Sequence, residues 1–280
     1  MILIADSGGS KVNWVLVENP STQKVHYFNS IGLNIKILSE ISVLNILEGV
    51  FNDISTGNIR QCFFYGAGIS DKVSREKMHN LLRYFLPQTQ ISVAHDLLGA
   101  ARAGLKSQPG NVLILGTGSN SAYYDGSQIT QQMGGHGYLF GDEASGAWFG
   151  KQFFSKTCLG SWPELEPDFW ATFQKNYTEY RNCVYHSGAP NAALAAIFPW
   201  LLKHKNNLEI KNLFQKGIQE FISKSIIAQK RDEHTAVIGS VGFFLQDVLA
   251  EILQSFSIHK LTVIQNPLTE LIDFHKNSKL

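Results

Sequence analysis

One pattern occurs twice in this 280-residue chain: an apolar strand, a turn rich in glycine and serine, and then a second strand. The two copies span 2–17 and 111–124, with turns SGGS at 7–10 and GTGSN at 116–120. Two β-rich runs that flank a glycine-rich turn predict a hairpin. The repetition therefore predicts two lobes of the same topology, each beginning with a glycine-bearing hairpin.

Helical and strand patterns alternate after each hairpin. Spacing and apolar runs predict further strands at 25–29, 61–65, 90–94, 128–133, 235–238 and 260–264. They predict helices at 39–54, 72–85, 97–105, 144–158, 167–181, 191–205, 208–229, 243–256 and 268–276. Pro199 should break or bend the helix at 191–205. The order of hairpin strands followed by helical crossovers predicts an α/β fold.

The length of the chain favours two domains, because a single core rarely serves 280 residues. The pattern restarts after a short hinge near 106–111, and the chain should cross back near 266. We therefore expect an N-terminal lobe of 1–110 plus 267–280 and a C-terminal lobe of 111–266.

Composition excludes several classes of protein. With 44% hydrophobic and 17% charged residues and a net charge of +1, the chain can bury a core but has no basic stripe for a nucleic-acid partner. No run approaches the ~18 apolar residues of a membrane span, and the N-terminus lacks the basic region of a signal peptide. Cys62, Cys158 and Cys183 are scattered, as expected of free thiols. We expect a cytoplasmic protein without a membrane partner.

The first glycine-rich turn follows Asp6 at the end of a strand. Its glycines allow several N–H groups to converge on an anion, and a carboxylate in this position could hold hydrated Mg²⁺. The segment lacks the GxxxxGK[ST] pattern of a Walker A loop. The turn at 116–120 has the same features: small residues and free N–H groups after a strand. Two such hairpins that face each other could bind one triphosphate from both sides. An ordinary hairpin turn is the alternative for each segment taken alone.

Asp96 follows the predicted strand at 90–94. A carboxylate at a strand terminus could act as a general base that takes the proton of a sugar hydroxyl as this oxygen attacks the γ-phosphate of a nucleotide. The alternative is that Asp96 caps the helix at 97–105, since aspartate is a preferred N-cap.

Two further glycine-rich segments are candidate binding loops. The segment 134–150, GGHGYLFGDEASGAWFG, combines glycines, a carboxylate pair and aromatic residues, as a carbohydrate pocket does. Its carboxylates could instead stabilise a helix N-terminus. The segment 239–242, GSVG, could let adenine and ribose approach the backbone, although a plain strand–helix turn explains it equally well.

The ordered set of turns resembles the BadF/BadG/BcrA/BcrD-type ATPases, and within them the N-acetylglucosamine kinases of the sugar kinase, Hsp70 and actin superfamily. The resemblance covers essentially the whole chain. It implies two actin-like (ribonuclease H-like) lobes with a cleft between them, each lobe a mixed five-stranded sheet flanked by helices. It also implies ATP-dependent phosphorylation of a small sugar, most readily an amino sugar such as N-acetylglucosamine, with Mg²⁺.

The resemblance assigns a role to each candidate residue. Asp96 matches the catalytic aspartate, and Asp6 lies near the metal. The expected phosphate-binding residues are Gly8, Gly9, Ser10, Lys11, Gly116, Thr117, Gly118 and Ser119. The expected adenosine-binding residues are Gly239, Ser240, Val241 and Gly242. The expected sugar-binding residues are Asn34, Gly66, Ala67, Gly68, Gly135, His136, Asp142 and Glu143.

The sequence departs from the family pattern at two positions. His136 stands where tryptophan or a similar residue is usual, and Glu270 stands where glycine is expected. Two alternative functions remain open: a sugar sensor that does not turn over, and an ATP-driven activator of a dehydratase, which needs cysteine thiolates for an iron–sulfur cluster. A homodimer is also left open.

Overall fold

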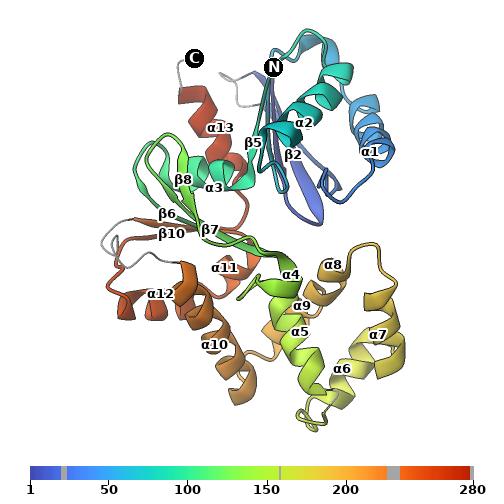
Figure 1. Ribbon diagram of the computed structural model, residues 1–280, viewed down its shortest axis with the longest axis vertical. Helices are drawn as coiled ribbons and strands as arrows, with labels where there is room; N and C mark the ends of the chain where they lie inside the picture. The colour runs from blue at the N-terminus through green and yellow to red at the C-terminus, as the bar shows by residue number, and fades with distance from the viewer. Residues whose placement is uncertain (20–23, 158, 226–233, 278–280) are drawn as a thin grey trace. The chain divides into compact units, whose positions relative to one another are not determined.

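The computed structural model describes residues 1–19, 24–157, 159–225 and 234–277 (Figure 1). The predicted thiol at Cys158 and the end of the helix predicted at 208–229 lie outside these residues. The chain divides into two compact units: residues 1–112, 124–130 and 266–280 form the first, and 113–123 and 131–265 form the second.

The first unit is built on a five-stranded mixed sheet with the strand order β3-β2-β1-β4-β5. Its strands are β1 (Ile2–Ser7), β2 (Lys11–Asn19), β3 (Lys24–Ile31), β4 (Gln61–Gly66) and β5 (Gln90–His95). The predicted hairpin is confirmed, because β1 pairs antiparallel with β2. Strands β1, β4 and β5 run parallel, so their carboxyl ends meet at one edge of the sheet.

Register places three residues in one row at this edge. Ser7 of β1 lies opposite Gly66 of β4, and Gly66 lies opposite His95 of β5. Asp6 lies one residue earlier in β1, opposite Asn13 of β2. The residues that end these strands therefore share one rim of the sheet.

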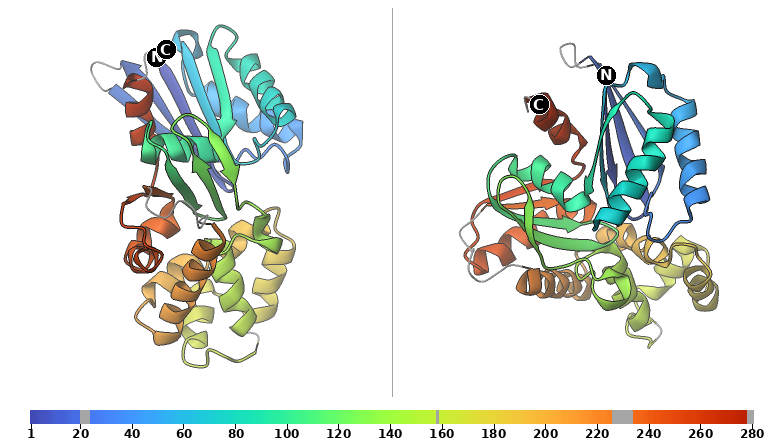
Figure 2. Two further views of the ribbon diagram at one scale, coloured as in Figure 1. Left: turned by 60° about the vertical axis from the view of Figure 1, so that its left-hand side comes forward. Right: turned by 45° about the horizontal axis from the view of Figure 1, so that its top comes forward.

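Helices cover both faces of this sheet (Figures 1 and 2). Helices α1 (Glu40–Asn52) and α2 (Lys72–Phe85) pack on one face, and α3 (Asp96–Leu105) and α13 (Leu268–Asn277) on the other. Because both faces are covered, the centres of β1 (2–5) and β4 (62–65) are apolar runs without polar alternation. The core under α1 and α2 includes the buried aromatic side chains of Trp14, Phe51 and Phe64.

Local capping determines where α1 and α2 begin. The side chain of Ser39 accepts a hydrogen bond from the Ser42 N–H at the start of α1. Asp71 and Ser74 form a reciprocal capping box at the start of α2. Both caps satisfy backbone donors that the helix itself leaves unpaired.

The second sheet also has five strands, in the order β10-β9-β6-β7-β8. Its strands are β6 (Gly110–Leu115), β7 (Ser119–Tyr124), β8 (Ile129–Gln132), β9 (Thr235–Ile238) and β10 (Leu261–Ile264). The turn at 116–118 joins the neighbouring strands β6 and β7, as predicted for the second hairpin. Strands β9 and β10 are parallel.

Several helices of the second unit are shorter than the sequence predicts. They are α4 (Gly137–Phe140), α5 (Gly146–Thr157), α6 (Glu166–Phe173), α7 (Tyr177–Tyr185), α8 (Pro190–Ala195), α9 (Phe198–Lys203), α10 (Leu208–Ser225), α11 (Ser240–Phe244) and α12 (Gln246–Ser255). The single helix predicted at 167–181 is wrong, because Gln174 adopts a left-handed conformation and ends α6. The break predicted from Pro199 is confirmed, since Pro199 lies in the first turn of α9.

The core of the second unit is rich in aromatic residues. Phe149, Phe153, Phe169 and Phe214 are all buried, with ring centroids of neighbouring pairs about 5 Å apart. Such a core holds the short helices together, although each is too short to be stable alone. Within the described ranges, no helix is both long and apolar enough to traverse a bilayer.

Candidate active site

The first glycine-rich turn is tied to neighbouring backbone at the edge of the first sheet. The Gly8 N–H donates to the Lys11 carbonyl at 3.0 Å and closes the turn. The Gly32 N–H donates to the Ser10 carbonyl at 3.2 Å. A Cβ on Gly32 would lie 2.9 Å from the Gly9 carbonyl oxygen, so the chain after β3 approaches the turn as closely as only glycine permits.

Asp6 is the acidic group of this rim. Its side chain hydrogen-bonds to Asn13, and Lys11 lies within electrostatic range. Burial, and after it the negative charge of Asp96, raises the pKa of Asp6 to about 7, although Asn13 and Lys11 act in the opposite direction. Two carboxylates that repel each other in a partly buried setting favour a cation beside them. Oxygen donors of this kind fit Mg²⁺, so Asp6 is a suitable metal ligand.

Asp96 begins α3 at the same rim. Its Oδ1 accepts the Leu97 N–H at 2.8 Å, and the side chain is 15% exposed. The alternative prediction, that Asp96 is the N-cap of this helix, is wrong. His95 is the N-cap, and Asp96 is the first helical residue. Asp96 is therefore held by a backbone hydrogen bond at the end of a strand, largely shielded but not fully buried, which is compatible with a general base.

The candidate sugar residues of the first unit also gather at this rim. Gly68 has a φ of +86°, and a Cβ at this position would overlap Asn34 Oδ1. Lys36 fastens the loop after β3 to the loop after β4, since its Nζ contacts Ser70 Oγ at 2.5 Å and Asp71 Oδ2 at 3.0 Å. The structure thus brings Asn34 and the 66–68 segment together, although they lie more than thirty residues apart in the chain.

The second glycine-rich turn is held by the N-terminus of α5. The N–H groups of Gly146 and Ala147 donate to the carbonyls of Gly116 and Thr117 at 2.8 and 3.1 Å. A Cβ on Gly118 would lie 2.8 Å from Asp142 Oδ2. Glycine at this position lets the turn pack against a carboxylate.

Asp142 therefore contacts the second turn directly. The Ser119 N–H donates to its carboxylate, while burial raises the pKa of Asp142 to about 6. The backbone of Asp142 and of Ala144 is left-handed, with φ of +58° at each. Such strain at a non-glycine residue persists only where the surroundings impose it, and it is frequent at functional sites.

Glu143 lies beside Asp142 but has a different partner. Lys224 of α10 contacts Glu143 Oε1 at 2.7 Å and Glu220 Oε1 at 2.8 Å. Burial alone would raise the pKa of Glu143, but the hydrogen bond and charge of Lys224 outweigh it and lower the pKa. Glu143 is thus a charged carboxylate anchored to α10, a partner that the sequence pattern did not indicate.

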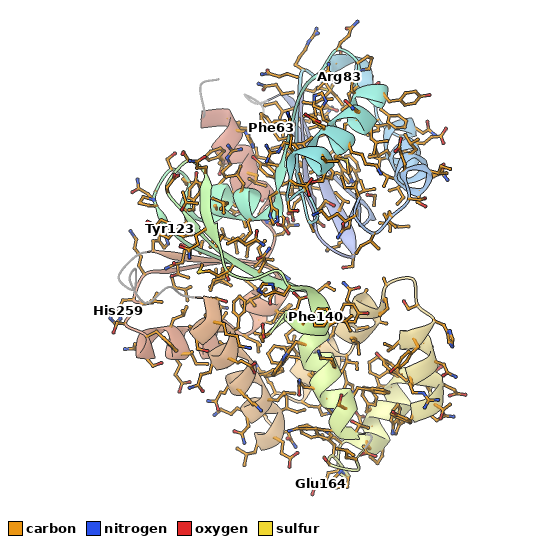
Figure 3. The ribbon with its side chains drawn as sticks, viewed as in Figure 1. Phe63, Arg83, Tyr123, Phe140, Glu164 and His259 are labelled. Carbon is orange, nitrogen blue, oxygen red and sulfur yellow. The ribbon has the colours of Figure 1, made fainter. Side chains whose placement is uncertain are left out.

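The part of this segment around His136 and α4 is largely exposed. His136 precedes α4 and lies within electrostatic range of Asp142 and Glu143. Gly135 has a φ of +82° and contacts the side chain of Asn120. Phe140 at the end of α4 is 86% exposed (Figure 3). Asp142 therefore packs on the second turn and Gly135 lies beside Asn120, while His136 and Glu143 are neighbours of Asp142.

The 239–242 segment lies next to the second turn. Gly239 has a φ of +122°, and its N–H donates to the Ile264 carbonyl at 2.9 Å. A Cβ on Gly239 would overlap the Leu115 carbonyl oxygen. A Cβ on Gly242 would lie 2.5 Å from Val237 Cγ1. The candidate adenosine and phosphate loops of the second unit are therefore contiguous, at the ends of β9 and β6.

We expect Gly239→Ala to lower the free energy of unfolding by more than about 2 kcal/mol, because the new methyl group meets a backbone oxygen and the φ is unfavourable for alanine. Urea unfolding would measure the change. Gly188→Ala is the matched control, since a Cβ there meets nothing within 4 Å. Equal stability of the two variants would contradict the tight packing at Gly239.

Two further residues of the candidate site are not among the residues predicted from the sequence. His95 contacts the candidate base, with 2.5 Å between its Nδ1 and Asp96 Oδ1. Lys224 holds Glu143. A histidine directly before a strand-end aspartate was the available signal for the first residue, whereas nothing local indicates the second.

The two mixed five-stranded sheets, with their flanking helices, define the actin-like ATPase fold. The chain is 30% identical to a candidate N-acetylglucosamine kinase from Porphyromonas gingivalis, with 100% of both chains covered and a TM-score of 0.93. It therefore belongs to the N-acetylglucosamine kinase-like family of BadF/BadG/BcrA/BcrD-type ATPases.

More distant structures share the fold. A candidate N-acetylglucosamine kinase from Chromobacterium violaceum is 19% identical, with 98% of both chains covered and a TM-score of 0.70. A ROK family glucokinase from Streptomyces griseus, in complex with glucose and AMPPNP, is 12% identical over 98% of this chain and 97% of its own, with a TM-score of 0.64. No family model and no curated protein sequence matches the chain.

Proposed function

We propose that this protein transfers the γ-phosphoryl group of ATP to a hydroxyl of a small sugar, with an amino sugar such as N-acetylglucosamine as the preferred acceptor. The observation that supports it most directly is the rim of the first sheet, where Asp96, Asp6 and the Asn34–Gly68 contact lie together. Membership of a family that contains candidate sugar kinases agrees with this chemistry.

Each unit contributes one half of the chemistry. In the first unit, Asn34 and the 66–68 loop would bind the sugar, and Asp96 would accept the proton of the attacking hydroxyl. The sugar oxygen forms a bond to the γ-phosphorus while the bond from this phosphorus to the β-phosphate oxygen breaks. Phosphorylated sugar and ADP are the products, and the proton resides on Asp96.

Asp6 and the first turn would serve the phosphates. Asp6 would hold Mg²⁺, which neutralises charge on the phosphates when bound. The N–H groups of Gly9 and Ser10 and the ammonium group of Lys11 are the expected donors to the phosphate oxygens. A proton on Asp6 would compete with the cation, because burial raises the pKa of this group to about 7.

The second unit would bind the nucleotide. The turn at 116–119 offers backbone N–H groups and hydroxyls to phosphate oxygens, and the contiguous 239–242 segment would receive adenosine. Asp142 supports the turn through the Ser119 N–H. His136 and Glu143, which lie near it, would contribute to sugar selection. We place this reaction in the cytoplasm.

Turnover assays distinguish this proposal from the alternatives. Purified protein is incubated with Mg-ATP and a panel of hexoses and hexosamines, and ADP release is followed. ADP release that depends on a sugar supports the kinase. Sugar binding without turnover would indicate a sensor instead. Sugar-independent hydrolysis by an iron-containing protein would indicate a dehydratase activator, although burial raises the pKa of Cys62 to about 12 and disfavours its thiolate.

A further inference from the structure

His95 is the last residue of β5 and the N-cap of α3, immediately before the candidate base. Its Nδ1 lies 2.5 Å from Asp96 Oδ1, and both side chains are shielded, with exposures of 19% and 15%. Register places it in the row that contains Gly66 and Ser7. The function outlined above assigns no role to this imidazole.

The short contact between Nδ1 and Oδ1 requires a proton between the two atoms. A deprotonated ring nitrogen and a carboxylate oxygen are both acceptors, and they would repel each other at 2.5 Å. A proton on Nδ1 makes the contact a charge-assisted hydrogen bond to Asp96. The Leu97 N–H lies within hydrogen-bond distance of both atoms, 2.8 Å from Asp96 Oδ1 and 3.1 Å from His95 Nδ1, and the contact to Oδ1 is the shorter.

This arrangement gives the two oxygens of Asp96 different roles. Oδ1 accepts two hydrogen bonds, from His95 and from the Leu97 N–H. Neither of these two contacts involves Oδ2. Oδ2 is therefore the oxygen to which we assign the proton of the sugar hydroxyl.

We propose that His95 is a positioning residue for phosphoryl transfer: its Nδ1–H holds Asp96 Oδ1 so that Oδ2 accepts the proton of the sugar hydroxyl. This inference rests on the proposed function. Capping alone does not require the imidazole, since Asp96 itself accepts the Leu97 N–H at the shorter distance.

Steady-state kinetics of three variants test the proposal. Asparagine places an amide N–H near the position of Nδ1, so His95→Asn should retain kcat within about threefold. His95→Gln carries its amide farther from the backbone, and His95→Ala has none. Both should lose about ten- to one-hundredfold in kcat, as expected for one hydrogen bond to a charged group, with both KM values within threefold. A kcat of His95→Ala or His95→Gln equal to that of the wild type would overturn the proposal.

Nuclear magnetic resonance gives a readout that needs no sugar. The nitrogen shifts of His95, assigned by their loss in His95→Asn, should show a protonated Nδ1 in the wild type and change in Asp96→Asn. A neutral ring protonated only at Nε2 in the wild type would overturn the proposal. If no sugar is phosphorylated, the proposed function fails, yet this spectrum still decides whether the His95–Asp96 hydrogen bond exists.

Discussion

Replacing Asp96 by asparagine should reduce sugar phosphorylation by about two orders of magnitude or more, while ATP binding stays within about twofold of the wild type. The amide has nearly the same shape and still accepts the Leu97 N–H through its oxygen. It cannot accept a proton from the attacking hydroxyl. The loss should therefore appear in kcat rather than in affinity for the nucleotide.

Two measurements check this prediction for Asp96→Asn. Coupled detection of ADP release gives kcat, and calorimetric titration with an ATP analogue gives the dissociation constant. Asp273→Asn is the matched control, because Asp273 is an exposed carboxylate on α13 of the same unit. Full activity of Asp96→Asn would remove this residue from the mechanism, whereas a parallel loss of nucleotide binding would indicate a structural defect.

Replacing Asp6 by asparagine should abolish most of the turnover and, above pH 7, stabilise the metal-free protein. Burial raises the pKa of Asp6 from 3.8 to about 7 in the folded state. The folded state therefore holds this proton more tightly than the unfolded state does. The stabilisation that comes from this tighter proton binding is complete below pH 3.8 and is lost as pH rises toward 7. Asparagine stays neutral and avoids that loss.

Unfolding by urea in the presence of a chelator, at pH 5 and pH 8, would measure this effect. From pH 5 to pH 8, the free energy of unfolding of Asp6→Asn should rise by about 1–2 kcal/mol relative to that of the wild type. The partial solvent exposure of Asp6 keeps this difference small. Added Mg²⁺ should stabilise the wild type at pH 8 and leave Asp6→Asn largely unchanged. A variant with the same pH dependence as the wild type would show that Asp6 ionises normally.

The two hairpins and most element boundaries could be predicted because they depend on neighbours within a few residues. The turn at 7–10 joins strands that pair with each other, and its glycines are visible in the sequence. The caps Ser39 and Asp71 act on backbone N–H groups three residues ahead. A local pattern is sufficient where the physical interaction is itself local.

The α-helical region between 134 and 225 was harder to predict for a physical reason. Its apolar periodicity indicates helices, but the left-handed Gln174 and the helix break before Phe198 depend on how short helices pack around a shared aromatic core. Helix α4 was missed because a glycine-rich segment has weak helical propensity. Tertiary packing overrides propensity in such segments.

The sequence alone determined which residue types are candidates for the chemistry: carboxylates at strand ends, glycines in two similar turns, and their order along the chain. Only the tertiary structure decided which of them meet. Asn34 contacts Gly68, Asp142 packs on Gly118, and Glu143 pairs with Lys224, eighty-one residues away. Contacts at such separations depend on strand order, register and helix packing across a whole unit, and no window of neighbouring residues contains that information.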